Sequence, residues 1–210
     1  CSSCFSRLKA AATAVAEDAN LAAQVEDEIG YAYQGSVTVQ HAVDTLMQRV
    51  GADRIAANVQ RPLTGLRVAC YYGCLVTRPG KVTGADHVEY PMQMDDLMRA
   101  LGAEPVDWSY KTDCCGGALT LTQTPLALEL TGKILRNARD CGADVVATVC
   151  PLCQMNLDAR QSQIGLEFRL PALYATQLMV LAFGQGAAAA ALTKNLVDPR
   201  PVLQAKGLVH

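Results

Sequence analysis

Residues 144–153, Asp-Val-Val-Ala-Thr-Val-Cys-Pro-Leu-Cys, join an apolar run to a pair of cysteines. The run Asp144–Val149 is nearly continuous in apolar residues, as expected of a parallel strand buried on both faces. Pro151 suits the first position of a helix that follows. Because ligands of open α/β sheets bind just outside the carboxyl ends of the strands, Cys150 stands where a bound group is expected.

Strands and helices alternate around this stretch. The patterns predict strands over Leu66–Cys70, Glu104–Trp108 and Asp144–Val149, and helices over Met92–Leu101, over Thr124–Cys141 and from Pro151. Thr124 is expected to cap its helix, with Pro125 at the first helical position. This order predicts an α/β fold with layers of parallel sheet and flanking helices.

The preceding part of the chain is predicted to be mainly helical. A short strand is expected at Val37–Val39, then helices over Ala42–Val50 and Asp53–Val59, and a connector over Arg61–Gly65. His41, before the first of these helices, is interpreted as a capping or packed histidine in preference to a site residue.

Five cysteines form the pattern Cys-x39-Cys-Cys-x34-Cys-x2-Cys, from Cys74 through Cys114 and Cys115 to Cys150 and Cys153. Thiolates bind metal clusters, and the glycines after Cys115 let backbone approach inorganic sulfur closely. The loops after parallel strands would bring all five thiols to one end of the sheet. A helix amino terminus there favours an anionic cluster and lowers thiol pKa values.

Zinc is the less favoured metal for this pattern. A four-thiolate zinc site more often uses two Cys-x2-Cys pairs, and five cysteines with one adjacent pair overfill a tetrahedral ion. The sequence therefore favours an iron–sulfur cluster.

Composition excludes several functions. The net charge of −2 and the 5% aromatic content argue against nucleic-acid binding. Nine cysteines at short spacings indicate a reducing, cytoplasmic environment. The charge-free run Leu170–Leu192 is interrupted by Pro171, Gly184 and Gly186, which favours a buried helix and a short Ala-rich helix over a membrane span.

Cys1 and Cys4 precede a helix-prone stretch in the manner of Cys150 and Cys153, and we interpret this as an internal repeat without its front half. The chain is thus expected to be a fragment. Residues 1–62 would be the remnant of a first domain, 63–186 a complete second domain, and 187–210 a C-terminal tail.

Four other residues receive mainly structural interpretations. Cys70 and Cys141 fall outside the cysteine pattern and are expected to be small buried hydrophobic residues. Arg78 and Lys81, in a long loop after Cys74, either pair with an acidic substrate or cluster charge or form a solvated face.

The motifs Val68–Cys74, Arg78–Pro79, Asp113–Gly117 and Cys150–Leu157 resemble the cysteine-rich CCG domain, and specifically the B subunit of heterodisulfide reductase. The resemblance extends from Cys1 to about Gly186. It implies an oxidoreductase acting on sulfur groups, like the reductases of coenzyme B–coenzyme M heterodisulfide, and active in a complex. Two motifs each bind a noncubane 4Fe–4S cluster in this family, and a disulfide is reduced between them.

The resemblance also implies roles for individual residues. The second cluster would have five ligands, namely Cys74, Cys114, Cys115, Cys150 and Cys153. Cys1 and Cys4 match the closing pair of the first motif. Leu75 occupies a position that can be polar in methanogen-type members, and the resemblance therefore implies a disulfide substrate without specifying the coenzyme M–coenzyme B heterodisulfide.

The implied partners are an iron–sulfur electron-delivery subunit, a flavin-containing subunit and a disulfide or thiol substrate. Two alternatives stay open: an electron-transfer CCG subunit like those of lactate or glycolate oxidation systems, and a zinc-binding or metal-free interaction fragment.

Overall fold

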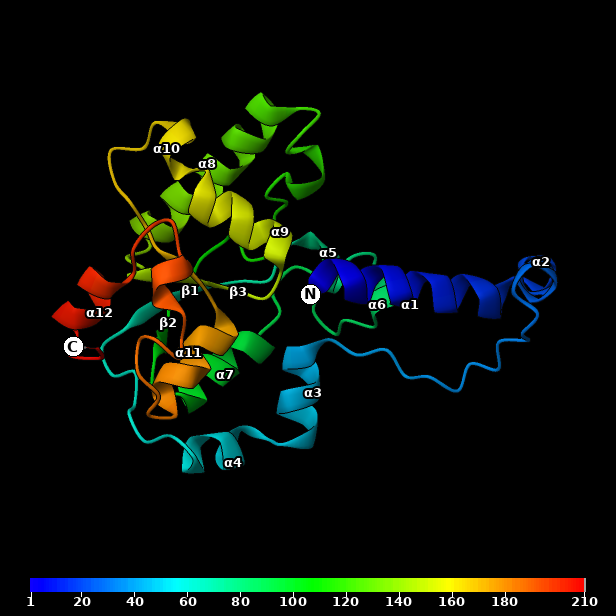
Figure 1. Ribbon diagram of the computed structural model, residues 1–210, viewed down its shortest axis with the longest axis horizontal. Helices are drawn as coiled ribbons and strands as arrows, with labels where there is room; N and C mark the ends of the chain where they lie inside the picture. Colours follow the sequence, from blue (N-terminus) through cyan, green and yellow to red (C-terminus); the bar gives the residue numbers. More distant parts are fainter. Residues whose placement is uncertain (210) are drawn as a thin grey trace.

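A parallel sheet lies at the centre of the computed structural model, which describes residues 1–209 (Figure 1). Its four strands, in the order β2-β1-β3-β4 across the sheet, are β1 (Arg67–Tyr71), β2 (Glu104–Pro105), β3 (Val145–Thr148) and β4 (Ala172–Tyr174). All three strand pairs are parallel, with Cys70 beside Ala147 and Thr148 beside Tyr174. The predicted α/β fold is confirmed.

Two helical layers enclose the sheet. On one face, Val68 and Cys70 belong to an apolar core that includes α7 (Gln93–Ala100) and α11 (Ala175–Ala182). On the other face, Ala69 and Tyr71 pack into a second core with α8 (Thr124–Asp140). Adjacent strand residues point to opposite faces, so a strand buried on both sides is apolar almost throughout.

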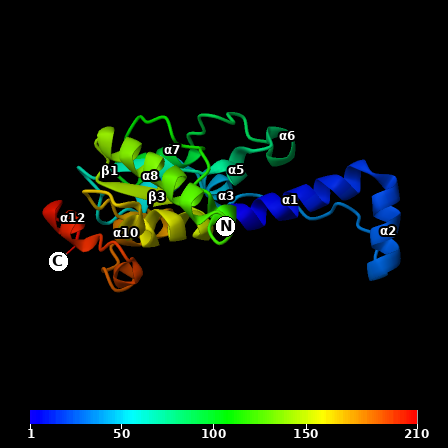
Figure 2. The same ribbon diagram turned by 90° about the horizontal axis from the view of Figure 1, so that it is seen from above.

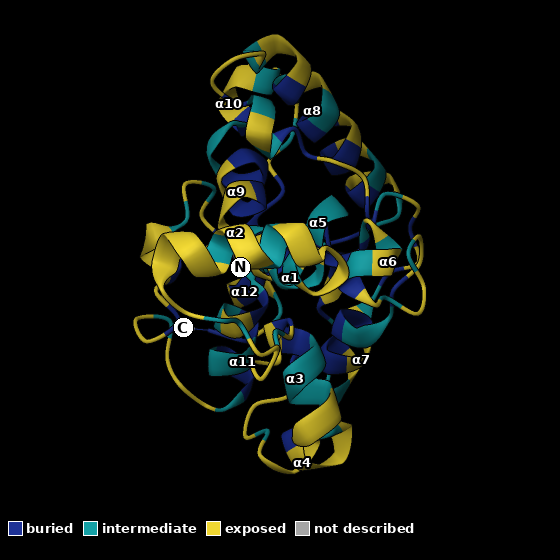
Figure 3. Ribbon diagram, turned by 90° about the vertical axis from the view of Figure 1, so that its right-hand side faces the viewer, coloured by how far each residue is buried: buried dark blue, intermediate teal, exposed yellow. Residues whose placement is uncertain are grey.

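The amino-terminal helices extend away from the sheet (Figures 1 and 2). They are α1 (Ser2–Glu17) and α2 (Ala19–Ile29), and α2 has no buried residue. Figure 3 shows α2 mostly exposed on this side of the molecule. The chain then returns through α3 (Ala42–Arg49) and α4 (Ala52–Ala57), close to the predicted helices.

Several short elements surround the carboxyl ends of the strands. They are α5 (Cys74–Thr77), α6 (Gly80–Thr83), the 3-10 turn Gly117–Leu119, α9 (Pro151–Gln154), the π-helix Met155–Ala159 and α10 (Gln161–Ile164). The prediction of a long loop after Cys74 is therefore wrong in part, because α5 and α6 lie within that segment. The Thr124 cap is also wrong: Gln123 is the N-cap residue, and the Thr124 hydroxyl donates to the Thr120 carbonyl at 2.9 Å.

Two strand predictions were wrong in extent or existence. The strand expected over Glu104–Trp108 is only Glu104–Pro105, at the sheet edge. Val37–Val39 forms no strand, because it has no strand beside it and instead lies along α1, lining a groove with Ala12.

The charge-free run Leu170–Leu192 also differs from its prediction. It begins with strand β4, which the apolar pattern did not indicate, and only then forms α11. Residues 187–191 form turns in place of an Ala-rich helix, after Gly184 adopts a left-handed φ of 80°. Among the described residues, no helix is long and apolar enough to cross a membrane.

The segment after residue 186 packs on the core. It includes the 3-10 turn Leu192–Lys194 and α12 (Arg200–Ala205), and Leu192 and Leu203 are fully buried. The carboxylate of Asp158 accepts the backbone N–H groups of Leu196 and Val197, both at 2.8 Å. The division into three domains and the internal repeat stay predictions.

Candidate functional site

One cavity of about 350 Å3 is lined by all five cysteines of the predicted pattern. They are Cys74 at the start of α5, Cys114 and Cys115 in the loop between β2 and α8, and Cys150 and Cys153 at α9. Because these segments follow three parallel strands, the thiols gather at the carboxyl ends of the sheet. The first turns of α1 form another part of the wall.

The five thiols differ in their exposure. Cys115, Cys150 and Cys153 are buried, Cys74 is partly buried, and Cys114 is exposed. The Sγ atoms of Cys115 and Cys153 lie 3.5 Å apart in a hydrogen bond. Cys115, Cys150 and Cys153 thus form the buried end of the cavity, and Cys114 lies at its exposed end.

Hydrogen bonds favour the thiolate at three of these positions, since a hydrogen bond from the Cys153 thiol also lowers the pKa of Cys115. The Cys74 thiol and the backbone N–H groups of Gly116 and Gly117 lower the pKa of Cys114 to about 6. A hydrogen bond from the Cys153 thiol lowers the pKa of Cys150 to about 5, and backbone N–H groups at the start of α9 act in the same direction.

The pKa values of Cys74 and Cys153, the thiols that donate these hydrogen bonds, are raised. Donation to Cys114 raises the pKa of Cys74, and hydrogen bonds to Cys115 and Cys150 raise the pKa of Cys153, with burial adding to both shifts. A metal bound here would displace the protons that these two thiols hold.

Glycines leave room beside the sulfur atoms. Gly73 has a left-handed φ of 70°, and a Cβ added there would lie 3.2 Å from the Cys153 Sγ. A Cβ on Gly117 would lie 3.5 Å from the Cys115 Sγ and 3.2 Å from the Leu152 Cβ. The cavity therefore has sulfur donors and a backbone cradle without side chains, which fits an iron–sulfur cluster.

The thiols are distributed around the cavity wall. Within residues 1–209, no three Cys, His, Asp or Glu side chains are grouped so that they could hold one metal ion. All nine cysteines are free thiols in this part of the chain.

A polar clamp holds the Cys115 backbone. The side-chain N–H of Asn156 donates to the Cys115 carbonyl at 2.8 Å, and the Thr131 hydroxyl donates to the same oxygen at 3.0 Å. The Thr120 hydroxyl in turn donates to the Asn156 Oδ1 at 3.0 Å. No local sequence pattern indicates these contacts, although Asn156 lies within the motif that carries the resemblance.

A buried ion pair lies beneath the Cys74 turn and was also missed. The Lys111 Nζ is 2.6 Å from the Asp95 Oδ1, with both side chains excluded from solvent. The Lys111 carbonyl accepts the N–H groups of Tyr72 and Gly73 at 2.9 and 3.1 Å. This pair therefore anchors the backbone that leads into Cys74.

The two basic residues of the predicted loop have different positions. Arg78 lines the cysteine cavity, but it is ion-paired with Glu89 and donates to the Thr112 carbonyl at 2.9 Å. Lys81 pairs with Glu17 at 3.3 Å and does not line the cavity.

Cys1 and Cys4 do not join the five thiols. Both are exposed, and the Cys1 sulfur accepts the backbone N–H of Cys4 at 3.4 Å at the start of α1. Of the other two cysteines, Cys70 is fully buried in the core as predicted, and Cys141 is half-buried against the second core.

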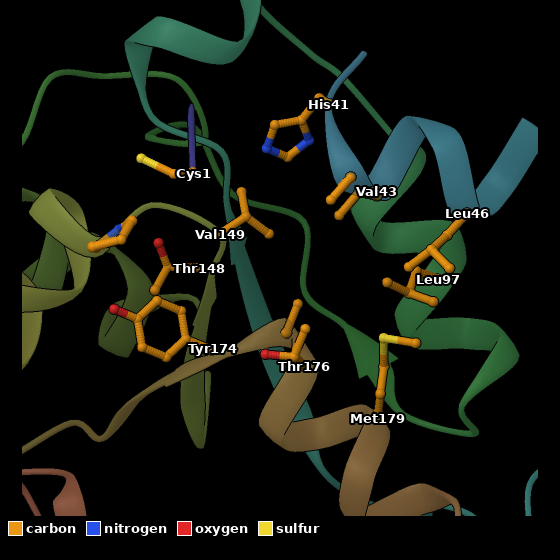
Figure 4. Close-up of a pocket in the computed structure, with 13 residues that line it drawn as sticks. Cys1, His41, Val43, Leu46, Leu97, Thr148, Val149, Tyr174, Thr176 and Met179 are labelled. Carbon is orange, nitrogen blue, oxygen red and sulfur yellow. The ribbon is translucent and has the colours of Figure 1, made fainter. Parts of the chain in front are cut away.

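A separate cavity of about 210 Å3 is lined by Cys1 and His41 at one end and by Met179 at the other (Figure 4). His41 is the N-cap residue of α3 but makes no side-chain capping bond. It is buried, with its ring edge-on to Phe5, and burial lowers its pKa to about 4. His41 is therefore packed, as predicted, but its side chain is no cap, and its Nε2 has no hydrogen-bond partner among the described residues.

Comparison with known proteins agrees with this geometry. The family model described as "CCG: Cysteine-rich domain" matches residues 68–158, which include all five cysteines of the cavity. The chain is 30% identical to the B subunit of the ferredoxin/F420H2-dependent CoB-CoM heterodisulfide reductase of Methanosarcina acetivorans, over 88% of this chain and 64% of that protein.

Two further relatives extend the comparison. The B subunit of the ferredoxin:CoB-CoM heterodisulfide reductase of Methanosarcina mazei is 28% identical, over 88% of this chain and 64% of that protein. The 8-methylmenaquinol:fumarate reductase membrane anchor subunit of Wolinella succinogenes is 34% identical, over 79% of this chain and 59% of that protein. The chain thus spans about three fifths of the length of these relatives. It contains a CCG cysteine-rich domain and is a homologue of the heterodisulfide reductase B subunit.

Proposed function

We propose that the chain is the cluster-bearing redox subunit of a heterodisulfide reductase-like complex. In this proposal a noncubane 4Fe–4S cluster is held by Cys74, Cys114, Cys115, Cys150 and Cys153. The observation that carries it is the placement of five sulfur donors around one cavity beside glycine backbone. Homology to the heterodisulfide reductase B subunit over most of the chain supports it.

The proposed reaction is R–S–S–R′ + 2 electrons + 2 protons → R–SH + R′–SH, or its reverse. When bound, the cluster supplies one-electron transfer and iron that can bind a substrate sulfur. The electrons would come from an iron–sulfur electron-delivery subunit and a flavin-containing subunit, in the cytoplasm. Partners of this kind fit the names of the relatives, which are subunits of multi-component reductases.

The chain's own residues have three tasks in this proposal. The low thiol pKa values of Cys114 and Cys150 prepare sulfur ligands at neutral pH. The clamp on the Cys115 carbonyl fixes the loop, and the buried thiols keep water from the deep end of the cavity. The exposed end at Cys114 gives a substrate and its protons access from solvent.

Substrate identity and the first cluster site are narrower parts of the proposal. Leu75 adds an apolar side chain to the cavity wall, which suits a disulfide with an apolar portion near the sulfur. Cys1 and Cys4 would close a first cluster site of the family type, at the start of α1.

Iron analysis tests the cluster directly. We expect iron and acid-labile sulfide in anaerobically purified protein, with an electron paramagnetic resonance (EPR) signal that Cys115→Ala abolishes or changes. Cys141→Ala is the matched control, because Cys141 lies outside the cavity and its variant should keep the signal. Protein without iron, or a signal unchanged by Cys115→Ala, would refute the proposal.

A second candidate function is electron transfer without disulfide chemistry. The relationship to a subunit of the 8-methylmenaquinol:fumarate reductase of Wolinella succinogenes favours it, since that enzyme is named for a quinol and fumarate and not for a disulfide. Anaerobic turnover separates the two: disulfide-dependent reoxidation of the reduced complex supports the reductase, and reoxidation that occurs only with an acceptor other than a disulfide supports electron transfer.

A further inference from the structure

The hydroxyl of Ser2 is buried in the wall of the cysteine cavity without a hydrogen-bond partner. Ser2 is 1% exposed, lines the cavity, and its Oγ is unpaired in the described chain. A buried hydroxyl is normally hydrogen-bonded, because its removal from water otherwise costs free energy. The unpaired Oγ therefore indicates that a bound group occupies the cavity and accepts its hydrogen bond.

Arg7 places a positive charge on the same helix and the same cavity. Ser2, Ser3, Ser6 and Arg7 recur at the spacing of one α-helical face, which explains why all four line the wall. Arg78, the other arginine in the wall, is ion-paired with Glu89, whereas Arg7 is exposed and forms no ion pair within residues 1–209. Its charge is therefore available to the contents of the cavity.

The backbone of α1 also reaches a thiol. The backbone N–H of Ser3 is among the groups that lower the pKa of Cys150, and the two residues line the same cavity. The first turn of α1 thus contacts the site through backbone and side chain.

We propose that the first two turns of α1 raise the reduction potential of the cluster held by the five cysteines. The Ser2 hydroxyl donates a hydrogen bond to sulfur in the cavity, and Arg7 contributes positive charge. This inference rests on the proposed cluster. Reduction adds negative charge to a cluster, so donors and cations beside it stabilise the reduced form more than the oxidised form. Ser2 and Arg7 act here as tuning residues without being ligands.

The test is a redox titration of the full chain, monitored by EPR. Ser2→Ala and Arg7→Gln should each shift the midpoint potential to a more negative value while the iron content stays that of the wild type. Ser2→Thr, which keeps a hydroxyl, and Arg7→Lys, which keeps a charge, should each lie closer to the wild type.

Two residues on α1 serve as matched controls. Thr13 and Lys9 line a different groove, so Thr13→Ala and Lys9→Gln remove a hydroxyl or a charge without touching the cavity. Their midpoint potentials should equal that of the wild type. A shift with Lys9→Gln as large as with Arg7→Gln would overturn the local role of Arg7.

A second readout follows the hydroxyl proton itself. Electron–nuclear double resonance after exchange into D2O should detect an exchangeable hydrogen coupled to the cluster in the wild type and lose it in Ser2→Ala. Unchanged potentials and couplings in iron-loaded variants would refute this inference and leave the cluster proposal intact. Wild-type protein without iron would refute the cluster proposal first.

Discussion

The side-chain N–H of Asn156 donates to the backbone carbonyl of Cys115 at 2.8 Å, across 41 residues of the chain. Asn156 lies in the π-helix and is fully buried. One side chain therefore fixes the adjacent-cysteine loop to the segment that follows Cys153.

Asn156→Ala should lower the free energy of unfolding by about 1–3 kcal/mol, because it leaves buried polar groups of Cys115 and Thr120 with fewer partners. Urea denaturation measures this loss. Asn20→Ala, at an exposed position of α2, should change stability by less than about 0.5 kcal/mol. Equal losses in the two variants would contradict the clamp.

Gly73→Ala should destabilise the protein through its backbone and through contact with sulfur. The Gly73 φ of 70° and ψ of 174° lie in a region that is essentially restricted to glycine and costs a residue with a Cβ about 1–3 kcal/mol, and the added methyl would press on the Cys153 Sγ. Gly51→Ala is the matched control, since Gly51 has a similar backbone conformation, with φ 84° and ψ 152°, and open space around its Cβ position. A larger loss for Gly73→Ala by urea denaturation, with less bound iron, is the expected result; equal losses and equal iron would exclude the sulfur contact.

Lys111→Met should lower the free energy of unfolding by about 3–5 kcal/mol, because it leaves the Asp95 carboxylate in the core without its cation. Lys133→Met removes an exposed partner of Glu129 and should lower stability far less than Lys111→Met does, because solvent screens this ion pair. Chemical denaturation of both variants checks the contrast. A loss from Lys111→Met no greater than that from Lys133→Met would show that the buried pair contributes little.

His41 should make stability depend on pH between about 6.5 and 4. Its pKa in the folded protein, about 4, lies below the ordinary 6.5. As the pH falls, the unfolded chain therefore binds the proton first, and stability that is complete above pH 6.5 is lost down to pH 4. The total is about 3 kcal/mol.

Urea denaturation across this pH range should show a shallower decline for His41→Gln than for the wild type. His87→Gln, which changes an exposed histidine, should keep the wild-type slope. A wild-type slope in His41→Gln would contradict the buried neutral state.

Cys114 should be the fast-alkylating thiol of the metal-free protein. Its rate with iodoacetamide, followed by mass spectrometry of its peptide, should have a midpoint near pH 6. Cys74→Ala should raise that midpoint because it removes the thiol that donates to Cys114, whereas Cys141→Ala should not. A midpoint that Cys74→Ala leaves in place would contradict this hydrogen bond.

Local patterns predicted the elements that are long or buried on both sides. β3, α7 and α8 follow from apolar runs and helical periodicity, and cysteine spacing located the cavity. The three-residue strand β4 was missed because a charge-free run does not distinguish an edge strand from the start of a helix. Asn156 and Lys111 were missed because their partners lie 41 and 16 residues away, beyond any local periodicity.

The two hydrogen bonds that Asp158 accepts from Leu196 and Val197 connect the C-terminal segment to the helix that supports the site. Asp158 and Asn156 belong to the same π-helix, so one short helix joins the cysteine loop on one side to the end of the chain on the other. Residues beyond 186 contain no cysteine and lie outside the motifs of the family. They nevertheless stabilise the π-helix that holds the cysteine loop. Shortening the chain there would loosen the site without removing a single sulfur atom.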